Sequence, residues 1–125
     1  MPDIPKKKIL IVEDEFFIVE LLSIHIERLG YNIVTARDGI EGLEMVKKEK
    51  PDLIILDVGL PRMDGITLCQ IVKSREATKH IHILMLTGRK LLGDMEDSFK
   101  AGADIYMNKP FEWNRLEGHI KRLLG

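Results

Sequence analysis

Short apolar runs alternate along the chain with longer segments in which apolar residues recur every three or four positions. The short runs resemble strands buried on both faces, and they predict five strands at residues 8–12, 32–36, 53–56, 81–86 and 104–107. The longer segments predict five helices at residues 15–29, 38–48, 66–75, 91–100 and 112–124. Asp38 with Glu41 three residues later is a capping-box pattern at the start of the second helix.

Strands that alternate with helices form parallel sheets whose crossovers are right-handed. The pattern therefore predicts an α/β fold with a five-stranded parallel sheet in the order 2-1-3-4-5 and helices on both faces, the flavodoxin-like (βα)5 arrangement. We expect one domain over residues 1–125, with residues 1–6 as a loose N-terminal tail. Ligands of such sheets bind outside the carboxyl ends of the strands, near the switch point between the first and third strands.

Charged and hydroxyl side chains follow four of the predicted strands. Glu13 and Asp14 follow the first strand, Asp57 the third, Thr87 the fourth and Lys109 the fifth. Each has an ordinary structural explanation when it is taken alone. Asp14 or Thr87 could cap a helix, Asp57 could begin a turn, and Lys109 could be solvated. Taken together, they predict three carboxylates, one hydroxyl and one ammonium at one edge of the sheet.

This combination of groups favours a particular chemistry. Three carboxylates that lie close together repel one another, and a hard divalent cation removes the conflict. Mg²⁺ fits an open acidic site with few carboxylates, with Mn²⁺ as an alternative, whereas Zn²⁺ would require Cys or His ligands. Lys109 and Thr87 could then bind the oxygens of a transferring phosphoryl group. The pattern predicts that Asp57 attacks phosphorus and becomes an acyl phosphate.

Charge and cysteine content narrow the partners and the compartment. The chain has 19 basic and 20 acidic residues and a formal net charge of −1, which gives no reason to expect contact with nucleic acid or a membrane. Its single cysteine, Cys69, permits no internal disulfide and is expected to be buried. No apolar run approaches the ~18 residues that a membrane span needs. We therefore expect a cytoplasmic protein.

The chain resembles the receiver domain of two-component response regulators, of the chemotaxis-regulator type. The resemblance extends over residues 7–124, and four motifs carry it: ILIVEDE (9–15), LIILDVGLPRMDG (53–65), LTG (86–88) and YMNKPF (106–111). It implies that Asp57 is the phosphoryl acceptor and that Thr87 and Lys109 contact the phosphoryl oxygens. It also implies a Mg²⁺ site made by Glu13, Asp14, Asp57 and the carbonyl of Gly59.

The resemblance further implies how the signal spreads. Tyr106 would turn inward when Thr87 moves toward the phosphate, and the Lys109–Pro110 bond would be cis. The surface formed by residues 91–100, Tyr106 and the last helix would then change partners. The alternative for Tyr106 is a half-buried strand aromatic that serves packing alone. Arg89 stands at a position that helps to set the lifetime of the phosphorylated state, where it could place a cation near the phosphate.

The partners implied by the resemblance are a sensor histidine kinase or a histidine phosphotransfer protein as donor, and an output domain or target that the sequence does not identify. The chain would be a switch rather than a turnover enzyme, and a monomer or a weak phosphorylation-dependent dimer. Two alternatives stay open. One is a phosphatase or phosphotransferase with an aspartyl-phosphate intermediate, against which Val58 and Gly59 stand in place of a second aspartate. The other is a receiver-like interaction module that works without phosphorylation.

Overall fold

The computed structural model describes residues 6–89 and 91–125. Its strands form one parallel sheet in the order β2-β1-β3-β4-β5, which confirms the predicted topology. The strands are β1 (Lys8–Val12), β2 (Asn32–Ala36), β3 (Leu53–Leu56), β4 (His82–Thr87) and β5 (Ile105–Asn108). The helices are α1 (Phe16–Arg28), α2 (Gly39–Glu49), α3 (Gly65–Ser74), α4 (Asp94–Lys100) and α5 (Trp113–Leu124). Of the tail expected at residues 1–6, all but Lys6 lies outside the described residues.

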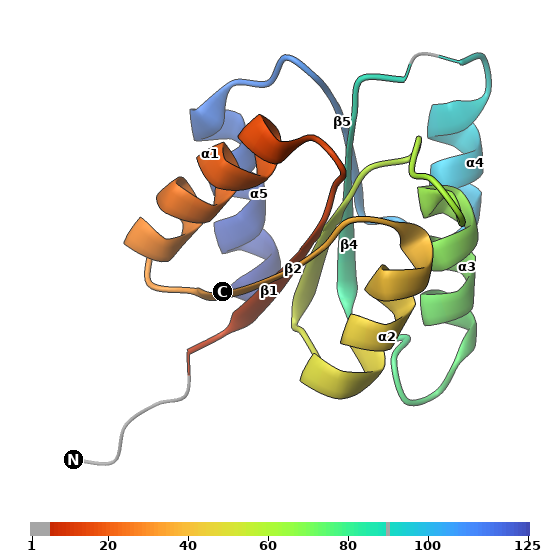
Figure 1. The fold of residues 1–125 in the computed structure, drawn as a ribbon, viewed down its shortest axis with the longest axis horizontal. Helices are drawn as coiled ribbons and strands as arrows, with labels where there is room; N and C mark the ends of the chain where they lie inside the picture. The colour runs from red at the N-terminus through yellow and green to blue at the C-terminus, as the bar shows by residue number, and fades with distance from the viewer. Residues whose placement is uncertain (1–5, 90) are drawn as a thin grey trace.

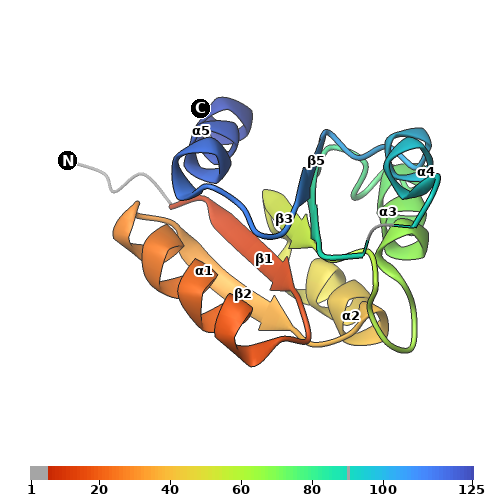
Figure 2. The ribbon, with the colours of Figure 1, turned by 90° about the horizontal axis from the view of Figure 1, so that it is seen from above.

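The sheet lies between two layers of helices (Figures 1 and 2). Helices α1 and α5 cover one face, and α2, α3 and α4 cover the other. Alternate residues of the buried strands supply two apolar clusters, because successive side chains of a strand point to opposite faces. Leu10 and Val12 belong to the cluster under α2 and α3, whereas Ile9 and Ile11 belong to the cluster under α1 and α5. Such double burial explains why these strands are apolar throughout.

Capping side chains mark the starts of α2 and α3. The Asp38 carboxylate accepts the backbone N–H of Glu41 at 2.8 Å, so the predicted cap of α2 is confirmed. The Asp64 carboxylate caps α3 in the same way, accepting the N–H of Thr67 at 2.8 Å. Cys69 is buried on the inner side of α3, as expected.

The fourth helix differs from its prediction. It begins at Asp94 rather than at residue 91, because Gly93 adopts a left-handed conformation with φ of 89° and marks the N-terminal end. The apolar residues of this segment do not form a buried stripe: Leu91, Met95 and Phe99 are all exposed. The side chains of α4 that are buried belong instead to Asp94 and Ser98.

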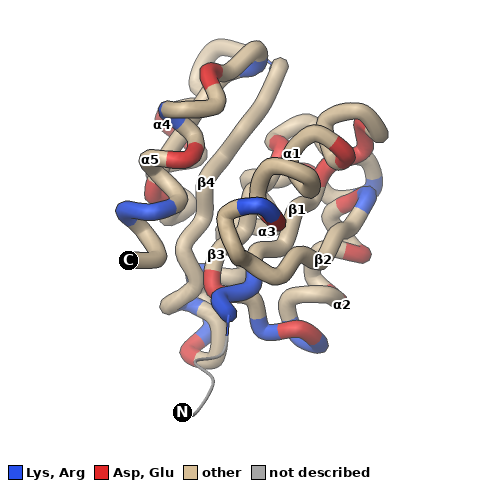
Figure 3. Tube along the Cα trace, turned by 90° about the vertical axis from the view of Figure 1, so that its left-hand side faces the viewer, with Lys and Arg blue, Asp and Glu red and all other residues tan. Residues whose placement is uncertain are grey.

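Acidic and basic positions are interspersed along the trace (Figure 3). Over the described part of the chain, no helix combines the length and the hydropathy that crossing a bilayer requires.

Candidate functional site

The sheet register places the predicted site residues at one edge. Val12 pairs with Leu56, Leu56 with Met85, and Thr87 with Asn108. The loops that follow β1, β3, β4 and β5 therefore begin side by side. The parallel order alone produces this result, since all carboxyl ends of the strands point the same way.

Three carboxylates meet at this edge. One oxygen each from Glu13, Asp14 and Asp57 lies within 4.8 Å of the others. Glu13 and Asp57 are buried, with 3% and 8% of their surface exposed, whereas Asp14 is open to solvent. Hard oxygen ligands with one open side suit Mg²⁺, which keeps several waters of its own. The alternative that Asp14 caps the first helix is wrong, because Glu15 is the N-cap residue of α1 and no side chain bonds there.

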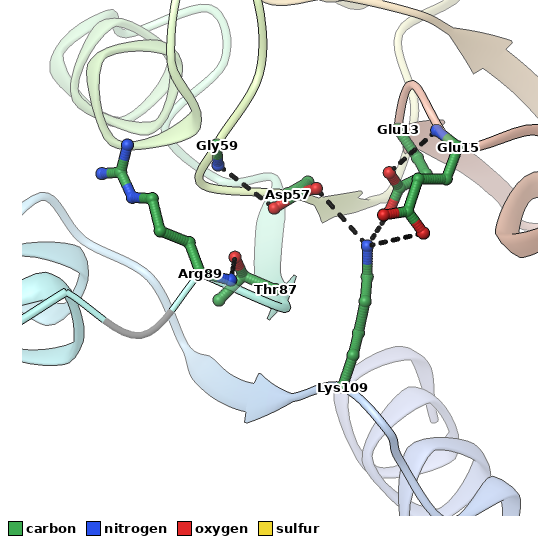
Figure 4. A network of polar contacts seen from close by, with 7 residues as sticks. All are labelled: Glu13, Glu15, Asp57, Gly59, Thr87, Arg89 and Lys109. Carbon is green, nitrogen blue, oxygen red and sulfur yellow. Dashed lines mark hydrogen bonds and ion pairs between the residues drawn. The ribbon is translucent and has the colours of Figure 1, made fainter.

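Lys109 reaches into the carboxylate cluster from the end of β5 (Figure 4). Its ammonium makes a direct ion pair with Glu13, and Nζ lies 3.4 Å from Asp57 Oδ2 and 3.9 Å from Glu15 Oε2. Only 11% of the Lys109 side chain is exposed, so the explanation of a solvated surface lysine is wrong. The Lys109–Pro110 peptide bond is cis, as expected.

The charges in this site are incompletely balanced. Burial raises the pKa of Glu13 to about 7, although the Lys109 ammonium and the Glu15 backbone N–H both favour the carboxylate. Burial acts to lower the pKa of Lys109, but hydrogen bonding and attraction to Glu13 and Asp57 outweigh it and raise that pKa. The three carboxylates of the cluster and this one ammonium leave a formal charge of −2. A divalent cation supplies the missing positive charge, so the residues present fit Mg²⁺.

Asp57 is held by its own loop. Its Oδ1 accepts the Gly59 N–H at 3.1 Å, which is a turn contact, and its backbone N–H bonds the carbonyl of Val12 at 3.1 Å. The loop returns at Gly65, where an added Cβ would lie only 2.1 Å from the Asp57 carbonyl oxygen. Gly65 thus permits the close approach of α3 to the site. The sequence indicated Gly65 only as a loop residue, and the collision it avoids depends on the folded loop.

Thr87 ends β4 with its side chain fully buried. Its Oγ1 accepts the backbone N–H of Arg89 at 3.0 Å, which leaves the hydroxyl hydrogen available to a ligand. The alternative role of Thr87 as a helix cap is wrong, because the N-cap residue of α4 is Gly93.

Arg89 has a partner that the sequence did not indicate. Its Nε and Nη2 donate to Oδ2 and Oδ1 of Asp94 at 2.9 and 3.1 Å, a bidentate contact with a buried carboxylate. This contact raises the pKa of Arg89 further. In the described structure the guanidinium therefore bonds Asp94 at the start of α4.

Tyr106 lies half-buried on β5, opposite Met85 of β4. Burial raises its pKa, with a smaller contribution from the nearby Asp94 carboxylate. It lines an open depression of about 480 Å³ together with Leu91, Leu92 and Met95. Tyr106 is thus next to both the Arg89–Asp94 pair and the exposed apolar side of α4, which keeps the switch prediction open.

Similarity to known proteins is extensive. Residues 9–121 match the sequence profile of the response regulator receiver domain. The alkaline phosphatase synthesis transcriptional regulatory protein PhoP of Bacillus subtilis (strain 168) is 44% identical over 118 residues, which cover 94% of this chain and 48% of that protein. The chain spans about half the length of the curated relatives it matches.

Solved structures agree with this. A CheY-like receiver domain protein from Methanospirillum hungatei JF-1 is 32% identical with a TM-score of 0.90, over 96% of this chain and 94% of that one. The receiver domain of a sensor histidine kinase from Pseudomonas aeruginosa PAO1 is 29% identical with a TM-score of 0.87, over 97% and 99% of the two chains. That structure holds a magnesium ion coordinated in its active-site cleft.

Proposed function

The chain belongs to the response regulator receiver family, and on that basis we propose that Asp57 accepts a phosphoryl group from a phosphohistidine. A receiver domain is a signalling switch rather than a turnover enzyme, so the phosphorylated chain itself is the product. The observation that carries the proposal is the buried Asp57 carboxylate, which lies 3.4 Å from the Lys109 ammonium and within a cluster of three carboxylates placed closely enough to hold a metal ion.

The transfer would proceed by attack of an Asp57 carboxylate oxygen on phosphorus. The P–N bond of the donor breaks, its electron pair stays on the imidazole nitrogen, and that nitrogen takes a proton from solvent. The Lys109 ammonium pairs with one phosphoryl oxygen, and the Thr87 hydroxyl donates to another. Lys109 already contacts Asp57, whereas Thr87, which is buried at the end of the neighbouring strand, would move toward the phosphoryl group before it donates.

We propose that Asp14 and Asp57 bind Mg²⁺ through carboxylate oxygens, Gly59 through its carbonyl, and Glu13 mainly through water. When bound, Mg²⁺ would neutralise the carboxylates and the phosphoryl oxygens that gather there. Mn²⁺ prefers similar oxygen ligands and is expected to substitute.

The remaining parts of the proposal concern the signal. The donor would be a sensor histidine kinase or a histidine phosphotransfer protein, and Tyr106 would turn inward as Thr87 engages the phosphate. The surface of α4, β5 and α5 would then meet an output domain or target in a monomer or a weak phosphorylation-dependent dimer. We propose that residues 1–125 form one receiver domain. The free, buried Cys69 fits a reducing compartment, and we propose the cytoplasm.

Intact mass spectrometry tests the acceptor directly. After incubation with acetyl phosphate and Mg²⁺, the wild type should gain one phosphoryl group. The same incubation with EDTA in place of Mg²⁺ should give no gain in mass. Asp57→Asn should gain nothing. The matched control is Asp52→Asn at the opposite end of β3, where the side chain accepts the Lys8 N–H at 2.8 Å, and this variant should be phosphorylated normally. Phosphorylation of Asp57→Asn, or none in folded wild type, would refute Asp57 as acceptor.

A further inference from the structure

Helix α4 has an inner side that is polar and an outer side that is apolar. Asp94 and Ser98, one turn apart, are buried, while Met95 and Phe99 are exposed. A helix that packs on a sheet normally buries its apolar stripe. The inner face of α4 thus contributes no large apolar side chain to the core, and its attachment must depend on other contacts.

One of those contacts is the ion pair between Arg89 and Asp94. Both carboxylate oxygens of Asp94 accept a hydrogen bond from the Arg89 guanidinium, at 2.9 and 3.1 Å. Asp94 is the first residue of α4, so the pair ties the start of the helix to the end of β4. Ser98, the other buried residue of α4, contributes no polar side-chain contact to this attachment, because its Oγ has no hydrogen-bond partner among the described residues.

The same arginine lies next to the phosphorylation site (Figure 4). Its backbone N–H bonds Thr87 Oγ1, and its Cδ would lie 3.6 Å from a Cβ placed on Gly59. Gly59 in turn donates its N–H to the Asp57 carboxylate. The aliphatic stem of Arg89 therefore lies close to the loop that carries Asp57. Once Asp57 is phosphorylated, the Arg89 guanidinium can choose between two anionic groups, the Asp94 carboxylate and the phosphoryl group.

Phosphorylation changes the competition for Arg89. The acyl phosphate carries roughly 1.5 to 2 negative charges where the Asp57 carboxylate carried one, and it offers three strong acceptor oxygens. Arg binds such groups in the bidentate manner that Arg89 now uses with Asp94. If the guanidinium moves to the phosphoryl group, the buried Asp94 carboxylate loses its cation. A buried charge without a partner is strongly unfavourable, so the first turn of α4 would open toward solvent.

We propose that the Arg89–Asp94 ion pair is a charge latch that holds α4 in the unphosphorylated protein and that opens when Arg89 transfers to the phosphoryl group on Asp57. The proposal rests on the proposed function, since it needs Asp57 to be phosphorylated. It assigns to Asp94 a positioning role in the switch, distinct from the inward turn proposed for Tyr106. It also assigns the exposed apolar residues of α4 to a segment that becomes mobile on activation.

Hydrogen–deuterium exchange of residues 91–100 tests the latch. The experiment compares samples with Mg²⁺ alone and with Mg²⁺ plus acetyl phosphate, and intact mass is recorded on each. In wild type, phosphorylation should speed exchange of this segment about tenfold, as expected when a charged hydrogen-bonded contact is lost. Asp94→Asn should show the faster exchange before phosphorylation and should still gain one phosphoryl group. Its exchange rate at residues 91–100 should then change little when the phosphoryl group is added.

Two further variants keep the result interpretable. Arg89→Gln removes the other partner and should also loosen α4 before phosphorylation. Lys100→Gln breaks the exposed Lys100–Glu96 pair of the same helix, 3.1 Å long, and should behave as wild type. Unchanged exchange in unphosphorylated Asp94→Asn would overturn the latch, as would wild type that gains the phosphoryl mass without faster exchange. Absence of the mass gain in wild type would overturn the proposed function itself, and the latch with it.

Discussion

Helices α3 and α4 cover the same face of the sheet and follow each other in the chain, yet they are held in opposite ways. Helix α3 buries Leu68, Cys69 and Val72, and the side chain of Asp64 caps its first turn. Helix α4 buries Asp94 and Ser98, and its N-cap residue has no side chain. The inner side of α3 is apolar, whereas the inner side of α4 carries an ion pair.

The difference matters because the two kinds of attachment respond to different signals. Apolar burial is proportional to area and does not depend on nearby charge. An ion pair can exchange partners when a new anion appears within reach. Under the proposed latch, a phosphoryl group at Asp57 would therefore move α4, while α3, which approaches the same residue through Gly65, would stay in place. The chemistry of their inner sides would then separate the stable part of this face from the movable part.

Alanine substitutions in α3 and α4 are expected to give the largest difference between the two helices, measured as the change in the free energy of unfolding. Leu68→Ala in α3 should lower the free energy of unfolding by about 2–5 kcal/mol, because the fully buried leucine leaves a cavity. Met95→Ala in α4 should change it by no more than about 0.5 kcal/mol, because Met95 is exposed. Urea denaturation of both variants measures this. Similar losses at the two positions would mean that α4 packs through its apolar side in solution.

A pH titration of stability extends the contrast to Glu13, a buried carboxyl group at the site edge of the sheet. Its pKa is raised from 4.5 to about 7, so the folded protein holds a proton there that the unfolded chain releases. In metal-free protein the free energy of unfolding should fall on the order of 2 kcal/mol as pH rises from about 4.5 to about 7. Cys69, the ionisable inner residue of α3, has its pKa raised to about 11 by burial and stays neutral throughout.

The control for this titration is Glu13→Gln, which lacks the group and should lack its share of the pH dependence. The difference between the two proteins therefore isolates Glu13 from all other titrating residues. Saturating Mg²⁺ should reduce that difference, because the cation favours the ionised carboxylate. Parallel stability curves for wild type and Glu13→Gln in EDTA would contradict the raised pKa.

The smallest expected effect concerns the unpartnered hydroxyl of α4. Ser98→Ala removes a buried Oγ that has no hydrogen-bond partner in the described part of the chain, and it should raise the free energy of unfolding by about 1 kcal/mol. Ser74→Ala, in the last turn of α3, removes an exposed hydroxyl bonded to the Ile71 carbonyl at 2.9 Å and should be near neutral. Thermal or urea unfolding of the Ser98→Ala and Ser74→Ala variants measures the two changes in the free energy of unfolding. A loss of stability in Ser98→Ala would show that the hydroxyl has a partner, such as an ordered water.

Most of the fold could be predicted from the sequence because its strands are short, those in the middle of the sheet are largely apolar, and helices of clear periodicity separate them. The start of α4 was the main error. Apolar residues at helical spacing, from Leu91 to Phe99, predicted a helix over residues 91–100, but Gly93 delays its start to Asp94, and those apolar residues face solvent. Periodicity shows that a helix has two sides, and it does not show which side another part of the protein will cover.

The sequence by itself determined the sheet order, the edge at which the site forms and the residues that reach it, because parallel strands bring all their carboxyl ends together. The tertiary structure alone decided the pairings within the site. Lys109 meets Glu13 across 96 positions of the chain, Gly65 meets the backbone of Asp57, and Arg89 turns to Asp94. Such contacts depend on distances and burial between separate elements, and burial is also what shifts the pKa of Glu13, so no local pattern contains them.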